Sequence, residues 1–93
     1  MRLSTYEINT IKETVAQYDS NAEVYLFGSR TDDNARGGDI DLLVLSQTIS
    51  YTDKLRIRIQ LADRMGNQKV DLLLKNQVDN AFSQMAYQQG LKL

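Results

Sequence analysis

Hydrophobic and polar positions follow two periodicities along the chain, one typical of helices and one of strands, which predict three helices and three strands. Apolar residues recur every three or four positions in the helical segments, and short β-branched or aliphatic runs mark the strands. In chain order we predict a helix over 4–18, strands over 23–27 and 39–45, a helix over 53–65, a strand over 69–74 and a helix over 78–89. The order α-β-β-α-β-α indicates an α/β (α+β) fold, in which a small mixed sheet of about three strands is flanked by helices.

Each predicted helix has boundary signals and one apolar stripe. We expect the first two stripes to face the sheet and the last to be part of the core or a docking face. Ser4 with Glu7 forms a capping box at the first helix, and Gly66 stops the second. The stripes are Ile8, Ile11, Val15 and Tyr18; Leu55, Ile59, Ala62 and Met65; and Val78, Phe82, Met85 and Gln89. Beyond Asp41 the strand over 39–45 is apolar on both faces, so it is predicted to be central in the sheet.

Length and charge restrict the function further. The chain has 93 residues, which suits a single domain spanning 1–93, and its net charge of −1 makes nucleic acid an improbable direct partner. The longest aliphatic run, Leu42 to Leu45, is too short to cross a membrane, and the N-terminus has no signal-peptide core. We therefore expect a cytoplasmic protein. Because the chain contains no Cys and no His, its chemistry must use carboxylates, hydroxyls, Lys, Arg and hard metal ions.

Three carboxylates stand at the start of apolar strands. Asp39 and Asp41 are two apart on one predicted strand and share a face, and Asp71 has the same context on another. If the strands are neighbours, the three anions converge and require cations. Oxygen ligands favour Mg²⁺, with Mn²⁺ as an alternative, and two ions about 3.5–4 Å apart can clamp a phosphoryl displacement.

A glycine–serine pair directly follows the strand over 23–27. Gly28 permits a close backbone approach and an unusual φ, and Ser29 supplies a hydroxyl. If a helical turn starts there, its free N–H groups form an anion site, to which Arg30 and Arg36 can add charge-assisted hydrogen bonds. The sequence thus predicts a nucleotide-binding site beside a metal cluster.

These residues carry a family resemblance. Phe27-Gly28-Ser29-Arg30, followed by Gly38-Asp39-Ile40-Asp41 and by Lys69-Val70-Asp71-Leu72, resembles the signature of the DNA polymerase β-type nucleotidyltransferase superfamily. The most similar subgroup is the minimal nucleotidyltransferase (MNT) domain, often the antitoxin of a HEPN/MNT toxin–antitoxin pair. The resemblance implies that Gly28 and Ser29 bind the triphosphate, that Asp39 and Asp41 bind metal, and that Asp71 assists metal binding and activates the acceptor. It also implies AMP transfer from ATP to a tyrosine of a HEPN-type toxin.

Other interpretations stay open at this point. Asp39 and Asp41 can be a solvated strand start, Asp71 an edge residue paired with Lys69 or Lys75, and Gly28-Ser29 a plain turn. Arg30 and Arg36 can be loop charges paired with Asp32 or Asp33, and Lys54, Arg56, Arg58 and Arg64 a solvated helix face. The functional alternatives are a non-catalytic module that neutralises a partner by docking, and a small-molecule transferase with a separate acceptor-binding subunit. The sequence does not decide the oligomeric state.

Overall fold

The computed structural model describes residues 3–31, 39–66 and 68–93. The predicted order of helices and strands is confirmed, with one short strand added. The elements are α1 (Thr5–Ala16), β1 (Glu23–Phe27), η1 (Gly28–Thr31), β2 (Ile40–Leu45), α2 (Tyr51–Arg64), β3 (Val70–Lys75), α3 (Ala81–Gln89) and β4 (Leu91–Lys92). The sequence predicts a polar loop from Thr31 to Gly38, and apart from Thr31 this loop lies outside the described residues.

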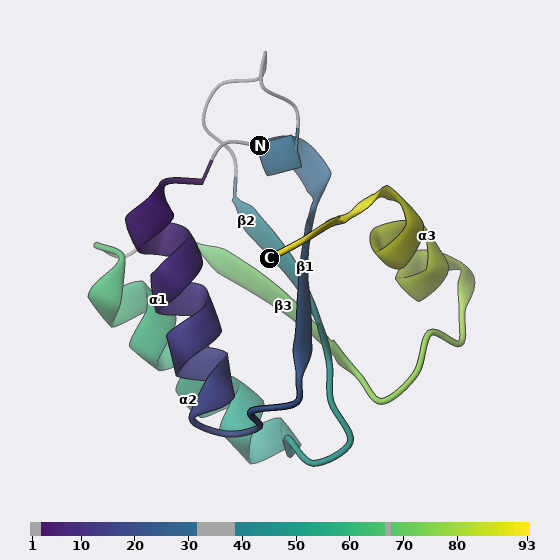
Figure 1. The fold of residues 1–93 in the computed structure, drawn as a ribbon, viewed down its shortest axis with the longest axis horizontal. Coiled ribbons are helices and arrows are strands. Elements are labelled where there is room, and N and C mark those ends of the chain that lie inside the picture. Colours follow the sequence, from purple (N-terminus) through teal and green to yellow (C-terminus); the bar gives the residue numbers. More distant parts are fainter. Residues whose placement is uncertain (1–2, 32–38, 67) are drawn as a thin grey trace.

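The strands form one mixed sheet in the order β3-β2-β1-β4 (Figure 1). β2 runs parallel to β3 and antiparallel to β1, and β4 pairs antiparallel with β1. As predicted, β2 is interior, and its residues Leu42, Leu43 and Val44 are fully buried. The fourth strand was not predicted, because its two residues, Leu91 and Lys92, are too few to show an alternating pattern.

Helices cover the two faces of the sheet unequally. α1 and α2 pack together on one face, and α3 alone lies against the other (Figure 1). The larger core lies under α1 and α2 and contains Ile11, Leu26, Ile40, Leu42, Ile57 and Leu61. The smaller core lies under α3 and contains Tyr25, Phe27, Leu43 and Ala86. The short α3 leaves part of its face open, and the candidate site lies there.

A capping box starts every α-helix. The predicted pair Ser4 and Glu7 is confirmed, and Ser50 with Asp53 makes the same reciprocal bonds, so that α2 begins two residues before the predicted position. Asn80 caps α3, which begins three residues after the predicted position. The stop at Gly66 is confirmed, with a φ of 69° that favours glycine.

The predicted inward stripe of α2 is wrong except at Met65, which packs against the larger core. Ile57 and Leu61 face the core, whereas Leu55 is 38% exposed and Ile59 is 69% exposed. The helix carries two apolar rows at helical spacing, and periodicity alone does not say which row meets the sheet.

The predicted stripe of α3 is divided between the core and the surface, since Met85 packs against the smaller core and Phe82 is largely exposed. Ser83 and Ala86 face the sheet, and Phe82 is 53% exposed. Small residues are needed on the inner face because the rings of Tyr25 and Phe27 already fill this side of the sheet. The ring of Tyr25 meets Tyr87 edge-on at 5.0 Å, and the ring of Phe27 meets Phe82 edge-on at 5.8 Å.

Within the described ranges, none of the helices combines the length and the apolar character that a bilayer crossing requires.

Candidate active site

Two of the predicted carboxylates are register partners in the sheet. Asp41 is the second residue of β2 and lies opposite Asp71, the second residue of the parallel neighbour β3. Register partners on adjacent strands project to the same face. That face is the one that α3 covers only in part, because Leu43 and Leu73, two positions further along the same strands, pack in the smaller core. The sheet therefore brings two acidic groups from distant parts of the sequence to one place.

Asp39 directly precedes β2 and adds a third negative charge to Asp41 and Asp71, and we call these three residues the acidic cluster. Its Oδ2 lies 3.4 Å from the Nζ of Lys69, which stands just before β3. The pKa of Asp41 is raised above its ordinary value, first by burial and then by the negative charges of Asp71 and Asp39, and Lys69 offsets part of this effect. The cluster thus holds more negative charge than its own cations balance, which favours a proton or a metal ion.

Gly28 packs directly against this cluster. It opens the 3₁₀ turn η1 with a φ of 79°, and a Cβ added to it would collide with Oδ2 of Asp41. The turn is closed by the Thr31 hydroxyl, which donates to the Gly28 carbonyl at 2.7 Å. Only glycine therefore fits here, for its conformation and for the space available.

The other predicted nucleotide-binding residues divide into two groups. Ser29 and Arg30 lie in η1 itself, so the predicted helical turn after β1 is confirmed. Arg36 lies outside the described residues.

The ion pairs considered for Asp71 as an alternative are not formed. Lys69 pairs with Asp39 rather than with Asp71, and Lys75 pairs with Asp79 at 2.9 Å.

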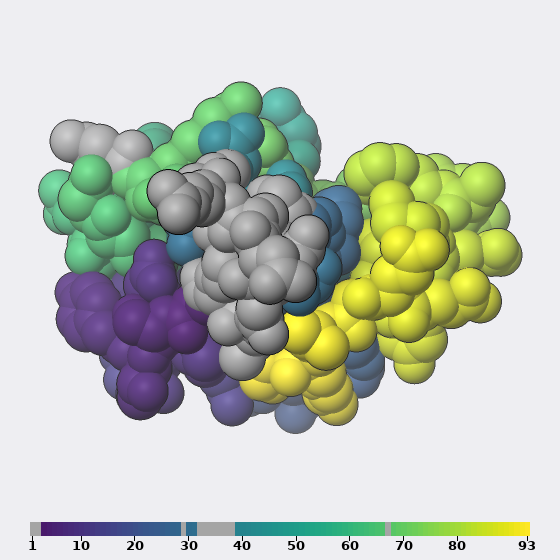
Figure 2. Space-filling view, turned by 90° about the horizontal axis from the view of Figure 1, so that it is seen from above, coloured from purple at the N-terminus to yellow at the C-terminus, as the bar shows by residue number. Residues whose placement is uncertain are grey.

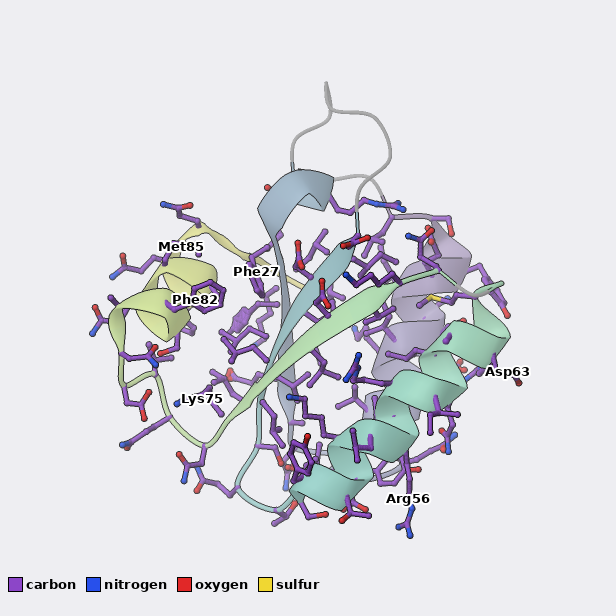
Figure 3. All side chains as sticks on the ribbon, turned by 180° about the vertical axis from the view of Figure 1, so that it is seen from behind. Phe27, Arg56, Asp63, Lys75, Phe82 and Met85 are labelled. Carbon is purple, nitrogen blue, oxygen red and sulfur yellow. The ribbon has the colours of Figure 1, made fainter. Side chains whose placement is uncertain are left out.

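A groove of about 420 Å³ opens beside the two paired carboxylates. Its floor includes Asp41 and Asp71, one wall is Phe82 of α3, and the other is Lys54 and Arg58 of α2. Figure 2 shows a notch between the lobe of α3 and the body of the molecule, and Figure 3 shows Phe82 turned toward Phe27 of the sheet. This groove can hold a ligand against the carboxylates.

Sequence reasoning did not assign Lys54, Arg58 and Phe82 to the site. The basic residues of α2 were visible as a stripe, and the structure separates them. Arg56 pairs with Asp53 at 3.5 Å and Arg64 with Glu13 at 3.2 Å, whereas Lys54 and Arg58 line the groove. Only the strand order, which places α2 beside the edge strand β3, distinguishes the groove residues Lys54 and Arg58 from Arg56 and Arg64.

Comparison with known proteins agrees with this geometry. The chain matches the family described as polymerase beta, nucleotidyltransferase, over residues 9–93. It belongs to that family.

A solved structure shares the nucleotidyltransferase fold. A chain of the toxin–antitoxin MntA-HpeT crystal structure, a mutant with two Asp-to-Glu substitutions, superposes with a TM-score of 0.73 and 22% sequence identity. The match covers 90% of the present chain and 69% of that chain. No curated protein sequence matches. At this identity the likeness extends to the fold.

The carboxylates of this nucleotidyltransferase domain have the chemistry of a site for hard cations. Among the described residues no three acidic, His or Cys side chains form a ready-made metal site. Instead Asp41 and Asp71 face one groove, and Asp39 pairs with Lys69. The ligand atoms of these carboxylates are all oxygens, and the pKa of Asp41 is raised by burial and by the negative charges of Asp71 and Asp39. These residues therefore fit Mg²⁺ or Mn²⁺ and not a soft metal.

Proposed function

We propose that this domain is a Mg²⁺-dependent nucleotidyltransferase that moves a nucleoside monophosphate from a nucleoside triphosphate to a hydroxyl group. The observation that carries the proposal is the register pair of Asp41 and Asp71, packed against Gly28 at the head of an open groove. Two carboxylates for metal binding, a backbone turn for phosphate and space for an acceptor are what this reaction requires.

In this proposal the carboxylates and the turn after β1 have different roles. Asp39, Asp41 and Asp71 would hold Mg²⁺, with two ions as the expected number, and the bound ions would neutralise negative charge on the phosphates. The turn of Gly28, Ser29 and Arg30 holds the β and γ phosphates through backbone N–H groups and side-chain donors, and Arg36 assists it.

The transfer step is a displacement at the α-phosphorus. The acceptor oxygen forms the new bond to this phosphorus, and the bond from the phosphorus to the bridging oxygen of the β-phosphate breaks, which releases pyrophosphate. Asp71 orients the acceptor hydroxyl and takes its proton. Because Asp71 belongs to the edge strand β3, an acceptor reaches it without crossing the sheet.

The nucleotide is ATP, the acceptor is a tyrosine of a HEPN-type toxin, and the protein acts as the antitoxin of that pair. Two observations support this more specific proposal: the resemblance of the Gly-Ser and Asp-x-Asp segments to MNT domains, and the fold shared with a chain of the toxin–antitoxin MntA-HpeT structure.

The proposal is tested with ATP carrying ³²P at either the α or the γ position. The protein, Mg²⁺ and a candidate HEPN-type partner are incubated together, and the partner is checked for label. We expect label from α-labelled ATP only, because γ-phosphate leaves with pyrophosphate. Asp41→Asn should abolish the transfer, and Asp63→Asn, which alters an exposed carboxylate of α2 far from the groove (Figure 3), should leave it unchanged. Absence of transfer by the folded wild-type protein contradicts the proposal.

A docking antitoxin without catalysis is distinguished by a double variant. If Asp39→Asn with Asp41→Asn still neutralises the toxin fully in cells, neutralisation depends on binding alone. If neutralisation and α-label transfer are lost together while the complex still forms, catalysis is required.

A further inference from the structure

An unpartnered surface adjoins the candidate active site. The outer face of α2 exposes Tyr51, Leu55 and Ile59, which are 69%, 38% and 69% exposed. Beside them, a second groove of about 570 Å³ runs between α2 and the start of β3 and includes Ala62 and Val70 in its lining. We call this groove, with the exposed face of α2, the α2/β3 surface. Apolar residues aligned along one exposed helix face are characteristic of an interaction site.

The surface continues into the carboxylate groove. Arg58 lines both grooves, so that a ligand lying on the α2/β3 surface is adjacent to Asp41 and Asp71. β3 is also the last strand of the sheet, and no described strand pairs with its outer edge. A strand edge without a partner is a template for an added strand.

The register of the sheet specifies what an added strand would present. A residue opposite Asp71 on such a strand would project to the same face as Asp71, and its neighbours would project to the α2 side. A hydroxyl-bearing side chain at that position would reach the carboxylates, while apolar side chains on either side of it would meet Leu55 and Ile59.

The charge of the surface specifies the partner further. The lining of the second groove contains the cations Arg58 and Lys69 and no carboxylate, and Lys54 lies on the side of the first groove. Lys69 pairs with Asp39, and Arg58 has no ion pair with any described residue. Acidic side chains are therefore favoured along the bound segment.

We propose that the α2/β3 surface binds an extended, apolar and acidic segment of the acceptor protein as an added strand on β3, with its hydroxyl residue opposite Asp71. This inference rests on the proposed function for the identity of the acceptor. The binding itself does not require that transfer occurs, so the two are measured separately.

The probe is a synthetic nine-residue peptide with a central tyrosine, valine on either side of it, glutamate three positions away in both directions and alanine elsewhere, so that valine and glutamate project to the α2 side. In a control peptide lysine replaces each glutamate. Binding of the fluorescein-labelled peptides is measured by anisotropy, and transfer from α-³²P-ATP is measured in parallel. We expect the glutamate peptide to bind about tenfold more tightly than the lysine peptide.

Two substitutions probe the surface, and one serves as a matched control. Arg58→Glu and Ile59→Glu change exposed positions of α2 and should each weaken binding of the glutamate peptide by about tenfold. Arg56→Glu makes the same charge change two residues earlier on α2, where the side chain points away from the sheet (Figure 3), and should leave binding unchanged.

Each outcome bears on one proposal. Peptide binding that depends on Arg58 and Ile59, together with no transfer to the acceptor protein, would support the docking surface and contradict the proposed reaction. Transfer to the acceptor protein that is equal in Arg58→Glu, Arg56→Glu and wild type would overturn the docking surface and leave the reaction standing. No peptide binding, or a dimer in light scattering that Ile59→Glu converts to monomer, would also overturn it, the latter by assigning the face to a second copy of this chain.

Discussion

At the scale of single residues, Gly28 is the most constrained position of the candidate site, and Gly66 provides its control. Both have a positive φ, of 79° and 69°, but a Cβ at Gly28 would strike the Asp41 carboxylate, whereas a Cβ at Gly66 would meet nothing within 4 Å. Gly66→Ala should lower the free energy of unfolding by about 1 kcal/mol and preserve activity. Gly28→Ala should cost more and also abolish transfer, as measured by urea unfolding and α-label transfer. Equal activity of the two variants would contradict the role of Gly28.

The carboxyl group of Asp41 should make the stability of the metal-free protein depend on pH. Its pKa in the folded state is raised above 3.8, so the folded state binds this proton more tightly than the unfolded state does. The contribution of Asp41 to stability is thus fully present below 3.8 and is lost as pH rises through the folded pKa. Asp41→Asn removes this loss, so in EDTA the variant should be more stable than wild type near neutral pH, with the difference shrinking toward acid pH. Urea unfolding at several pH values measures the difference, and a pH-independent one contradicts the account.

At the scale of helices and strands, the sequence predicted what is local and missed what depends on packing. Capping residues, strand runs and the Gly-Ser turn act within a few positions, so the chain order and most boundaries follow from them. The acidic positions Asp39, Asp41 and Asp71 were recognisable because a carboxylate is unusual in an apolar strand. Lys54, Arg58 and Phe82 were not, because they join the site only through the strand order and the rotation of α2 and α3 about their axes.

The two apolar rows of α2 make this rotation testable. Ile57 is fully buried and Ile59 is 69% exposed, two positions further along the same helix. Ile57→Ala should lower the free energy of unfolding by about 2–5 kcal/mol, because it leaves a cavity in the larger core. Ile59→Ala should change it by at most about 0.5 kcal/mol. Urea titrations of both variants measure the contrast, and a reversed order would mean that the stripe predicted from sequence is the inner one.

At the scale of the whole molecule, the carboxylate groove and a buried hydrogen-bond network lie at opposite ends of the sheet. At the end away from Gly28, the buried Ser46 follows β2, and its hydroxyl donates to Asp19 at 2.6 Å. The same hydroxyl accepts from the backbone N–H groups of Thr48 and Ile49. This network joins the loop after α1 to the loop before α2. It holds the two helices over the larger core without contributing any group to the carboxylate groove.

This separation predicts that ligand-induced stabilisation and basal stability respond to different substitutions. Under the proposed function, Mg²⁺ and ATP bind the folded state and not the unfolded one, so at about one hundred times Kd they should add about 2.7 kcal/mol, or roughly 10–20 °C in Tm for a domain of this size. Ser46→Ala removes a buried hydroxyl and should lower the basal free energy of unfolding by about 1–3 kcal/mol, with the ligand-induced shift retained. Asp41→Asn should show the reverse, a basal Tm at neutral pH no lower than that of wild type and little or no shift. Thermal scans with and without Mg²⁺ and ATP measure both quantities, and an Asp41→Asn protein with the full shift would place the nucleotide elsewhere.

Since Asp41 and Ser46 lie at opposite ends of β2, their effects should add in the double variant, and a large departure from additivity would show that the two ends are coupled.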